Sequence, residues 1–198
     1  MELFERTYRI TFTDEILGTL PGNREIFKDF VAKKAEAVDE ESEALPVDVA
    51  SEIEKGTTVF PRTEDGAPFL YDYQIRGYFK EACKFLKKVK DTKSSGEKAY
   101  KQKIDGLIFI KDRQNPIYVN GEIGVCERPL RASTPQGDRV ALSRSESIPE
   151  GSSCTFTVQC LIEKDLELVE EWLRYGQLHG TGQWRNGGKG RFCFEEIK

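Results

Sequence analysis

The stretch DLELVEEWLRYGQLHGTGQWRNGGKGRFCFEEI, from Asp165 to Ile197, holds the clearest structural pattern in this chain of 198 residues. Apolar residues recur at helical spacing over its first twelve positions, so residues 165–176 are predicted to form a helix with Asp165 as the N-cap. Residues 176–192, the glycine loop, follow it, and RFCFEEI is predicted to be a strand. The chain therefore ends in a helix, a glycine-rich loop and a strand.

Outward from this stretch, short alternating or apolar runs predict further strands, at residues 3–12, 104–111, 116–125 and 154–162. An apolar stripe over residues 73–90 predicts a second amphipathic helix with a basic flank. Residues 91–103, DTKSSGEKAYKQK, are polar and predict a flexible loop. Residues 126–150 carry four arginines and a turn signal, TPQGD, and predict a projecting β-hairpin.

Without insertions, the predicted order of elements is β-α-β-β-α-β. This order is typical of an α+β fold of the ferredoxin-like or RRM-like kind, a four-stranded antiparallel sheet with two helices on one face. We expect one domain over residues 1–198. It would carry an insertion at residues 19–60, a helix followed by a mobile acidic segment, and the projecting hairpin at 126–150.

The formal net charge of −4 hides an uneven distribution. Residues 36–54 hold eight acidic residues and no lysine or arginine, and the chain without them has a net charge of +4. No apolar run approaches the roughly 18 residues of a membrane span, and the N-terminal residues lack the features of a signal peptide. A cytoplasmic protein with no membrane partner is expected.

The cysteine and histidine content excludes several classes of site. The five cysteines form no CxxC pair, and their odd number and wide spacing argue against a disulfide framework or a zinc site, so buried reduced thiols are expected. His179 is the only histidine, which excludes a His-rich metal site, and no motif supports a nucleophilic triad around it. We assign no cofactor, no metal ligand and no catalytic residue.

The glycine loop admits two interpretations. A nucleotide-binding fingerprint is disfavoured, because that motif leads from a strand into a helix, and here the order is reversed. The glycines could simply form turns in a flexible loop. Alternatively they could let a phosphate backbone approach main-chain N–H groups, while the basic residues neutralise phosphates and the tryptophan stacks on a base. The residues of this phosphate cradle are Gly182, Trp184, Arg185, Gly187, Gly188, Lys189, Gly190 and Arg191.

Three stretches in order resemble the RAMP superfamily, the RNA-binding backbone and processing subunits of class 1 CRISPR antiviral systems. GTGQWRNGGKGRF resembles its C-terminal glycine-rich loop, DGAPFLYDYQIRGYFKEACKFL its Gly-x-Pro loop and the helix that opens with Ile-Arg-Gly, and SESIPEGSSCTFTV its Glu-x-Ile-Pro-x-Gly stretch. The matching positions are Gly66, Pro68, Ile75, Arg76, Gly77, Glu146, Ile148, Pro149 and Gly151. The family's usual Pro-Gly-Ser-Ser before the first helix is replaced by LYDYQ.

The resemblance implies a ribonucleoprotein subunit that holds single-stranded guide RNA by its phosphate backbone, with protein subunits, including copies of itself, as partners. It adds Arg76 to the RNA-binding residues of the glycine loop. The arginines of the hairpin could contact nucleic acid or a neighbouring subunit as a thumb, or could be solvated; they are Arg128, Arg131, Arg139 and Arg144.

Two alternatives remain. One is an interaction protein that mimics a backbone subunit and interferes with effector assembly. The other is an endoribonuclease of the same superfamily, dependent on a metal or not, although no general acid/base pair is visible. His179 is expected to be stacked or at the core edge rather than catalytic.

Overall fold

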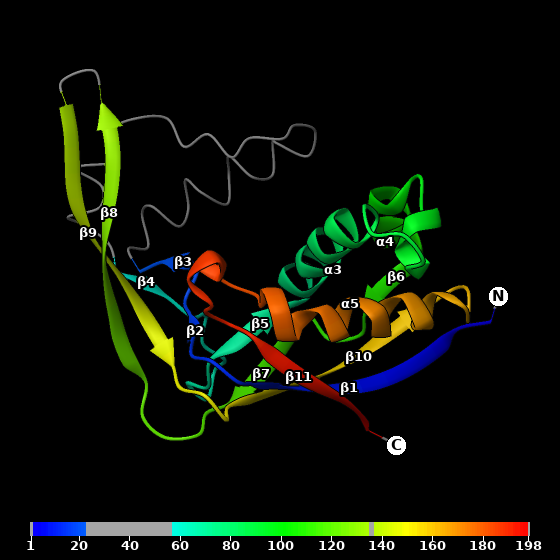
Figure 1. Ribbon diagram of the computed structural model, residues 1–198. Helices are drawn as coiled ribbons and strands as arrows, with labels where there is room; N and C mark the ends of the chain where they lie inside the picture. The colour runs from blue at the N-terminus through cyan, green and yellow to red at the C-terminus, as the bar shows by residue number, and fades with distance from the viewer. Residues whose placement is uncertain (1, 23–56, 135–136, 198) are drawn as a thin grey trace.

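The computed structural model describes residues 2–22, 57–134 and 137–197 (Figure 1). The helix and acidic segment predicted within the insertion lie almost wholly at residues 23–56, outside the described residues. The ends of that predicted insertion are described, and they pair with each other as two short strands, β3 (Leu20–Pro21) and β4 (Thr58–Val59).

The main sheet contains six strands rather than the four that were predicted. They are β1 (Phe4–Phe12), β5 (Phe69–Tyr71), β6 (Ile108–Ile110), β7 (Gln114–Tyr118), β10 (Ser153–Cys160) and β11 (Phe192–Ile197). Their order is β11-β1-β10-β7-β5, and β6 pairs with β10 beside β7. Every pairing is antiparallel. The difference arises because β6 and β7 share one flank of β10, and β5 extends the sheet beyond β7.

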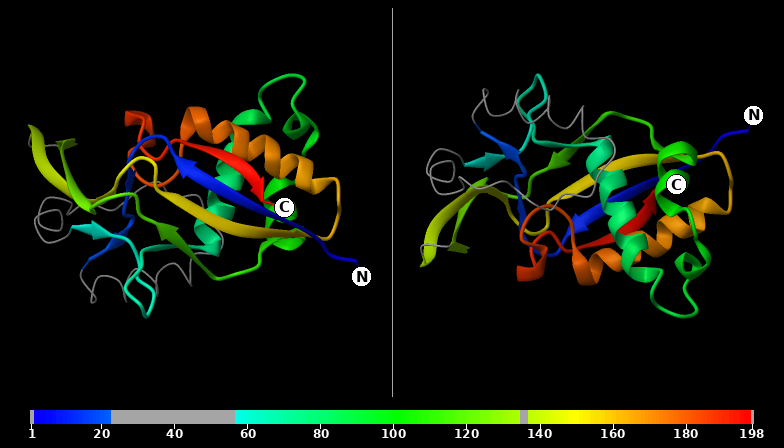
Figure 2. Two further views of the ribbon diagram at one scale, coloured as in Figure 1. Left: turned by 90° about the horizontal axis from the view of Figure 1, so that it is seen from below. Right: turned by 90° about the horizontal axis from the view of Figure 1, so that it is seen from above.

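Two helices, α3 (Asp72–Leu86) and α5 (Asp165–His179), lie on the same side of this sheet (Figure 2). Alternate residues of β1 and β10 face them, and Tyr8 pairs with Phe156 at the centre of that layer. The indole of Trp172 is fully buried against Phe79, and the Tyr78 hydroxyl donates to the Trp172 carbonyl at 2.6 Å. The predicted α+β class is confirmed.

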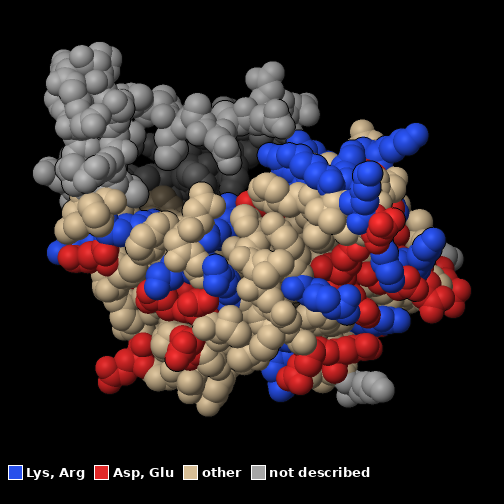
Figure 3. All heavy atoms as spheres, in the orientation of Figure 1, with Lys and Arg blue, Asp and Glu red and all other residues tan. Residues whose placement is uncertain are grey.

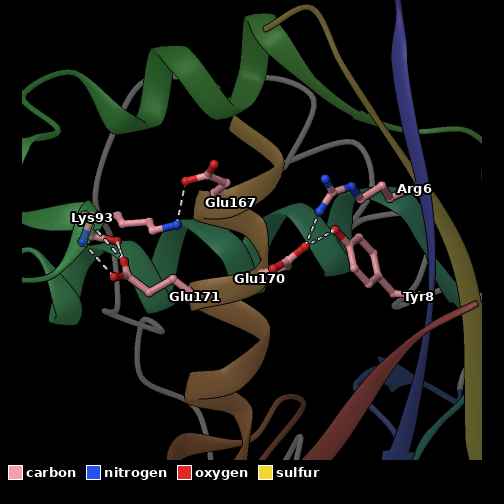
Figure 4. Close-up of polar contacts among 7 residues, drawn as sticks. Arg6, Tyr8, Lys93, Glu167, Glu170 and Glu171 are labelled. Carbon is pink, nitrogen blue, oxygen red and sulfur yellow. Dashed lines mark hydrogen bonds and ion pairs between the residues drawn. The ribbon is translucent and has the colours of Figure 1, made fainter. Parts of the chain in front are cut away.

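Residues 91–103 are not the flexible loop that their polarity predicts. They contain a 3₁₀ turn, η1 (Lys93–Gly96), and the start of α4 (Tyr100–Leu107). The Glu171 carboxylate of α5 accepts from the backbone N–H groups of Lys93 and Ser94, at 2.7 and 3.0 Å (Figure 4). The Ser94 hydroxyl donates to Glu171 and accepts from the Trp172 indole N–H. These contacts order the segment, and a composition-based prediction cannot anticipate them.

Other element boundaries also differ from the predictions. The helix predicted at 73–90 ends at Leu86, and the strand predicted at 104–111 is helical up to Leu107. The strand predicted at 116–125 is split between β7 and the start of β8 (Gly124–Thr134), with Gly121 at φ 111° in the gap. Asp165 is the first residue of α5 and not its N-cap, and its buried carboxylate pairs with Lys103 at 3.0 Å.

The second sheet contains the hairpin. Its strands β8 (Gly124–Thr134) and β9 (Gly137–Ile148) pair antiparallel along their length, over the range in which a hairpin is predicted. Strand β2 (Ile16–Leu17) and strand β4 flank β9. The hairpin projects away from the main sheet (Figure 1). Its base therefore joins the β1–β2 segment, next to the glycine loop.

The cysteines are all free, and the prediction of buried thiols holds for three of them, Cys83, Cys154 and Cys160. Burial raises the pKa of the Cys154 thiol to about 12. Cys193 is exposed and Cys126 is partly exposed, so the prediction was wrong for these two.

Candidate nucleic-acid interface

The glycine loop is folded back on itself. Its first four residues complete α5, and the N–H of Thr181 then donates to the carbonyl of Gly190 at 2.9 Å. The N–H of Gly190 donates to the Glu15 carbonyl, also at 2.9 Å, which ties the loop to the segment after β1. The N–H groups of residues 187–189 donate to carbonyls of Trp184 and Arg185. These five N–H groups are therefore already hydrogen-bonded within the protein, so at these positions only side chains are left to face a ligand.

Gly190 shows why this loop needs glycine. Its φ is 70°, and a Cβ at this position would overlap the Thr181 carbonyl oxygen. Gly188 also has a positive φ, 86°, but a Cβ there would meet only the Arg191 guanidinium, at 3.5 Å. The fold itself therefore explains glycine at position 190, whereas Gly188 lies beneath the side chain of a candidate phosphate ligand.

Two of the three cations in the glycine loop are paired with carboxylates. Arg185 contacts Glu81 of α3, with 2.7 Å between Nη1 and Oε2, and Lys189 contacts Glu15. Burial opposes the ionisation of Glu15, but hydrogen bonds from Lys189 and Ser147 outweigh it, so the Glu15 pKa lies below its usual value. Arg191 is exposed and forms no ion pair with any described residue.

Arg76 and Arg144 also have acidic partners. Arg76 pairs with Asp72 one turn earlier in α3, at 3.2 Å, while its buried Nε has no hydrogen-bond partner among the described residues. Arg144 pairs with Glu127 across the hairpin at 2.6 Å, and both side chains are exposed. A phosphate would have to compete with these carboxylates.

Arg128 is buried, although an arginine on a projecting hairpin was expected to be exposed. Only 7% of it is exposed, and its guanidinium donates to the Gln183 side chain at 2.6 Å. The same guanidinium lies 5.3 Å from the ring centre of Trp184, a cation–π contact that leaves the indole 43% exposed. Burial lowers the Arg128 pKa. The structure thus joins the hairpin base to the glycine loop, which the sequence did not indicate.

Arg131 and Arg139 lie further along the hairpin. Their backbones pair within the β8–β9 ladder, opposite Val140 and Ala132 respectively. Their side chains fall outside the described part of the structure.

A cleft of about 330 Å³ separates the glycine loop from α3. Its apolar lining comes from β2, β3 and Phe60, and its polar rim includes Gln74, Glu81 and Arg185. Tyr73 lines the cleft and is partly exposed, and its ring stacks on Tyr71 at 5.0 Å between centroids. Tyr73, Gln74 and Glu81 are not among the residues predicted from the sequence. The sequence held one signal for Tyr73, since it is an aromatic residue in the first turn of the predicted helix, one turn before Gly77.

Gly77 lines the same cleft from the middle of α3. It is exposed, and a Cβ placed on it would meet no atom within 4 Å. Glycine in a helix interior is destabilising by roughly 1 kcal/mol relative to alanine. Nothing in the described structure requires glycine here.

His179 occupies the position predicted for it, stacked at the edge of the core. Its ring stacks on Tyr175 at 5.5 Å and lies 5.2 Å from Phe85. Its Nε2 is 3.1 Å from Glu81 Oε1, close enough for an ion pair but without hydrogen-bond geometry. Glu81 thus lies between His179 and Arg185.

No family model and no curated protein sequence matches this chain. Among solved structures, it resembles a chain of the Type III-B Cmr-beta complex bound to cognate target RNA, with a TM-score of 0.56 and 10% identity. The match covers 100% of this chain and 61% of that chain, so this chain spans about three-fifths of its relative. At 10% identity, this likeness establishes a shared fold alone.

Two weaker likenesses involve other CRISPR proteins. A chain of a Type IV-B CRISPR complex has a TM-score of 0.48 and 10% identity, with 98% of this chain and 90% of that chain covered. Cmr6 from Pyrococcus furiosus has a TM-score of 0.47 and 11% identity, with 98% and 99% covered. Both TM-scores lie below 0.5, so no argument rests on these two likenesses.

Within the described ranges, no three His, Cys, Asp or Glu side chains gather as a metal site. No helix in the described part of the chain is long and apolar enough to cross a membrane.

Proposed function

We propose that this protein binds single-stranded RNA in the cleft between α3 and the glycine loop, as a RAMP-type subunit of a CRISPR ribonucleoprotein complex. In this proposal β1, α3, β6, β10, α5 and β11 form a ferredoxin-like core, and β5 and β7 are additions to it. Supporting it are the three sequence resemblances and the fold shared with a chain of an RNA-bound Cmr complex. Protein subunits, including further copies of this chain, would be its other partners.

Gly77 is the observation that carries the proposal. A mid-helix glycine with open space around it lowers helix stability without serving the described fold. It does leave the backbone of α3 bare where the helix lines the cleft. A ligand that packs closely against this turn of α3 would account for glycine at this position.

Side chains of the cleft and of the glycine loop suit RNA. The Arg191 guanidinium is available for a phosphate, and Arg185 could exchange Glu81 for one. Tyr73 and Trp184 both expose part of an aromatic ring, which can stack on a base of any sequence. The roles of Arg76, Lys189 and the hairpin arginines are proposed as secondary, because Arg76, Lys189 and Arg144 are paired and Arg128 is buried.

The test compares two helix glycines. Gly77→Leu would fill the space in front of α3, and Gly106→Leu is the matched control, since a Cβ at Gly106 in α4 also meets nothing within 4 Å. Both changes should preserve or raise the thermal midpoint, because leucine favours helix. Gly77→Leu should weaken binding to single-stranded RNA about tenfold, the loss of roughly one stacked base.

The titration should include single-stranded DNA and duplex RNA beside single-stranded RNA. Gly106→Leu should bind all three as the unaltered protein does. Unchanged RNA affinity in a folded Gly77→Leu protein would refute the cleft as the binding site.

A further inference from the structure

A row of cations runs along α3 away from the cleft. Arg76, Lys80, Lys84 and Lys88 follow one another at intervals of four residues, which places them on one side of the helix and its C-terminal extension. Arg76 begins the row next to Gly77, at the cleft. Like charges at this spacing repel one another, so the row destabilises an isolated helix.

Acidic residues compensate only the first half of the row. Arg76 pairs with Asp72, and Lys80 pairs with Asp105 of α4 at 2.6 Å. Lys84 and Lys88, the second half of the row, belong with three neighbouring lysines to an exposed group that we name the lysine surface. Its members make no ion pair with any described residue; they are Lys84, Lys87, Lys88, Lys90 and Lys98.

The lysine surface is continuous in space. Lys87 Nζ lies 3.5 Å from the Lys98 carbonyl and 5.6 Å from the centre of the Tyr100 ring, so the end of α3 contacts the segment before α4. Figure 3 shows basic side chains gathered over α3 and α4. Five charges without acidic partners are therefore concentrated on one exposed area.

The helix dipole explains part of this arrangement and not all of it. Cations in the last turn of a helix are favourable, which suits Lys84 and Lys87. Lys90 and Lys98 lie beyond the end of α3, where the dipole has no further effect. Repulsion among five uncompensated lysines is relieved most directly by a polyanion.

We propose that the lysine surface is a second RNA-contacting site, and that a single strand bound at the cleft continues along α3 to reach it. This inference rests on the proposed function. From Gly77 to Lys88 the helix rise amounts to about 17 Å. That is about five nucleotides at the spacing of a stacked strand, so only an RNA longer than this reaches both sites.

The experiment measures affinity against salt for two RNA lengths. Lys84→Gln with Lys88→Gln removes two charges from the lysine surface. Arg9→Gln with Lys111→Gln is the control, which removes two exposed charges that are paired with Glu195 and Glu5 on the main sheet. The RNAs have about four nucleotides, shorter than the span, and about twenty, longer than it.

For the long RNA, the lysine variant should flatten the plot of log affinity against log salt by about 1.4, two contacts at about 0.7 each. For the short RNA it should leave the slope unchanged, and the control variant should leave both slopes unchanged. An unaltered slope on the long RNA would overturn the second site while leaving the cleft intact. If the lysine variant bound the long RNA more weakly while Gly77→Leu kept its RNA affinity, the result would instead overturn both the cleft and the continuous path.

Discussion

The glycine loop and the lysine surface are both basic, but they use their charges differently. In the glycine loop, Arg185 and Lys189 are held by Glu81 and Glu15, and the backbone N–H groups of Thr181 and residues 187–190 donate within the protein. In the lysine surface no member has an acidic partner among the described residues. A motif rich in glycine and arginine therefore serves first to join elements of the fold, and the uncompensated charge lies at and beyond the C-terminal end of α3.

The difference follows from position. The glycine loop connects α5 to β11 and must also contact α3 and the segment after β1, so carboxylates from both neighbours hold it. The lysine surface lies at the far end of α3, where Lys87 contacts the carbonyl of Lys98 and the ring of Tyr100 but no carboxylate pairs with its members among the described residues. Bound polyanion would thus displace ion pairs at the first region and meet free charges at the second.

The largest expected effect tests whether the glycine loop is fixed by the fold. Gly190→Ala should destabilise the protein by about 3–5 kcal/mol, because it adds a clash with the Thr181 carbonyl to the cost of a positive φ. Gly188→Ala is the matched change, because a Cβ at Gly188 would not clash with the backbone and only the positive φ opposes it. It should destabilise the protein by about 1–2 kcal/mol. Denaturant unfolding measures both. Equal effects would mean that the loop adapts readily at Gly190.

The next effect concerns the support of the lysine surface. Glu171→Ala should destabilise the protein by about 2–3 kcal/mol, because two backbone N–H groups and the Ser94 hydroxyl lose a charged acceptor. Glu167→Gln serves as the control, because that exposed carboxylate pairs only with Lys93 Nζ, and thermal unfolding should not distinguish it from the unaltered protein (Figure 4). A stable Glu171→Ala protein would show that η1 is held by other contacts.

A smaller effect separates the cations within the glycine loop. Arg191→Ala should flatten the salt dependence of RNA binding by about 0.7, the loss of one phosphate contact on a single strand. Arg185→Ala should change the slope less, because Glu81 already neutralises that guanidinium. A larger change in slope for Arg185→Ala than for Arg191→Ala would indicate that RNA displaces Glu81, and that the ion pair forms only in the free protein.

The smallest expected effect is the pH dependence of the stability contributed by the ion pair between Lys189 and Glu15. The Glu15 pKa is lowered from 4.5, so this contribution to stability is complete above about pH 4.5 and is lost as the pH falls through the lower folded-state value. The Lys189 pKa is raised from 10.5 by its hydrogen bond to Glu15. The stability that this ion pair contributes is therefore complete below about pH 10.5 and is lost as the pH rises through the higher folded-state pKa. Glu15→Gln should remove both effects from a plot of unfolding free energy against pH. An unchanged plot would assign the acid sensitivity to other carboxylates.

Local pattern in the sequence was sufficient for the elements that have one buried face. β1, β10 and α5 are periodic because alternate or every third to fourth residue enters the core, and their predictions needed no knowledge of the neighbours. The basic residues of the glycine loop and of α3 were equally visible as residue types. Their ionic partners were not, because Glu81 lies about a hundred positions before Arg185 and Glu15 further still before Lys189.

Only the tertiary structure decided which polar groups are used and which are free. It held η1 through Glu171, buried Arg128 beneath Trp184, and assigned several backbone N–H groups of the glycine loop to the protein's own carbonyls. Hydrogen bonds and ion pairs are short-ranged and join residues distant in sequence, so the sequence by itself determines which groups are present and the packing of α3, α5 and the main sheet determines which of them meet.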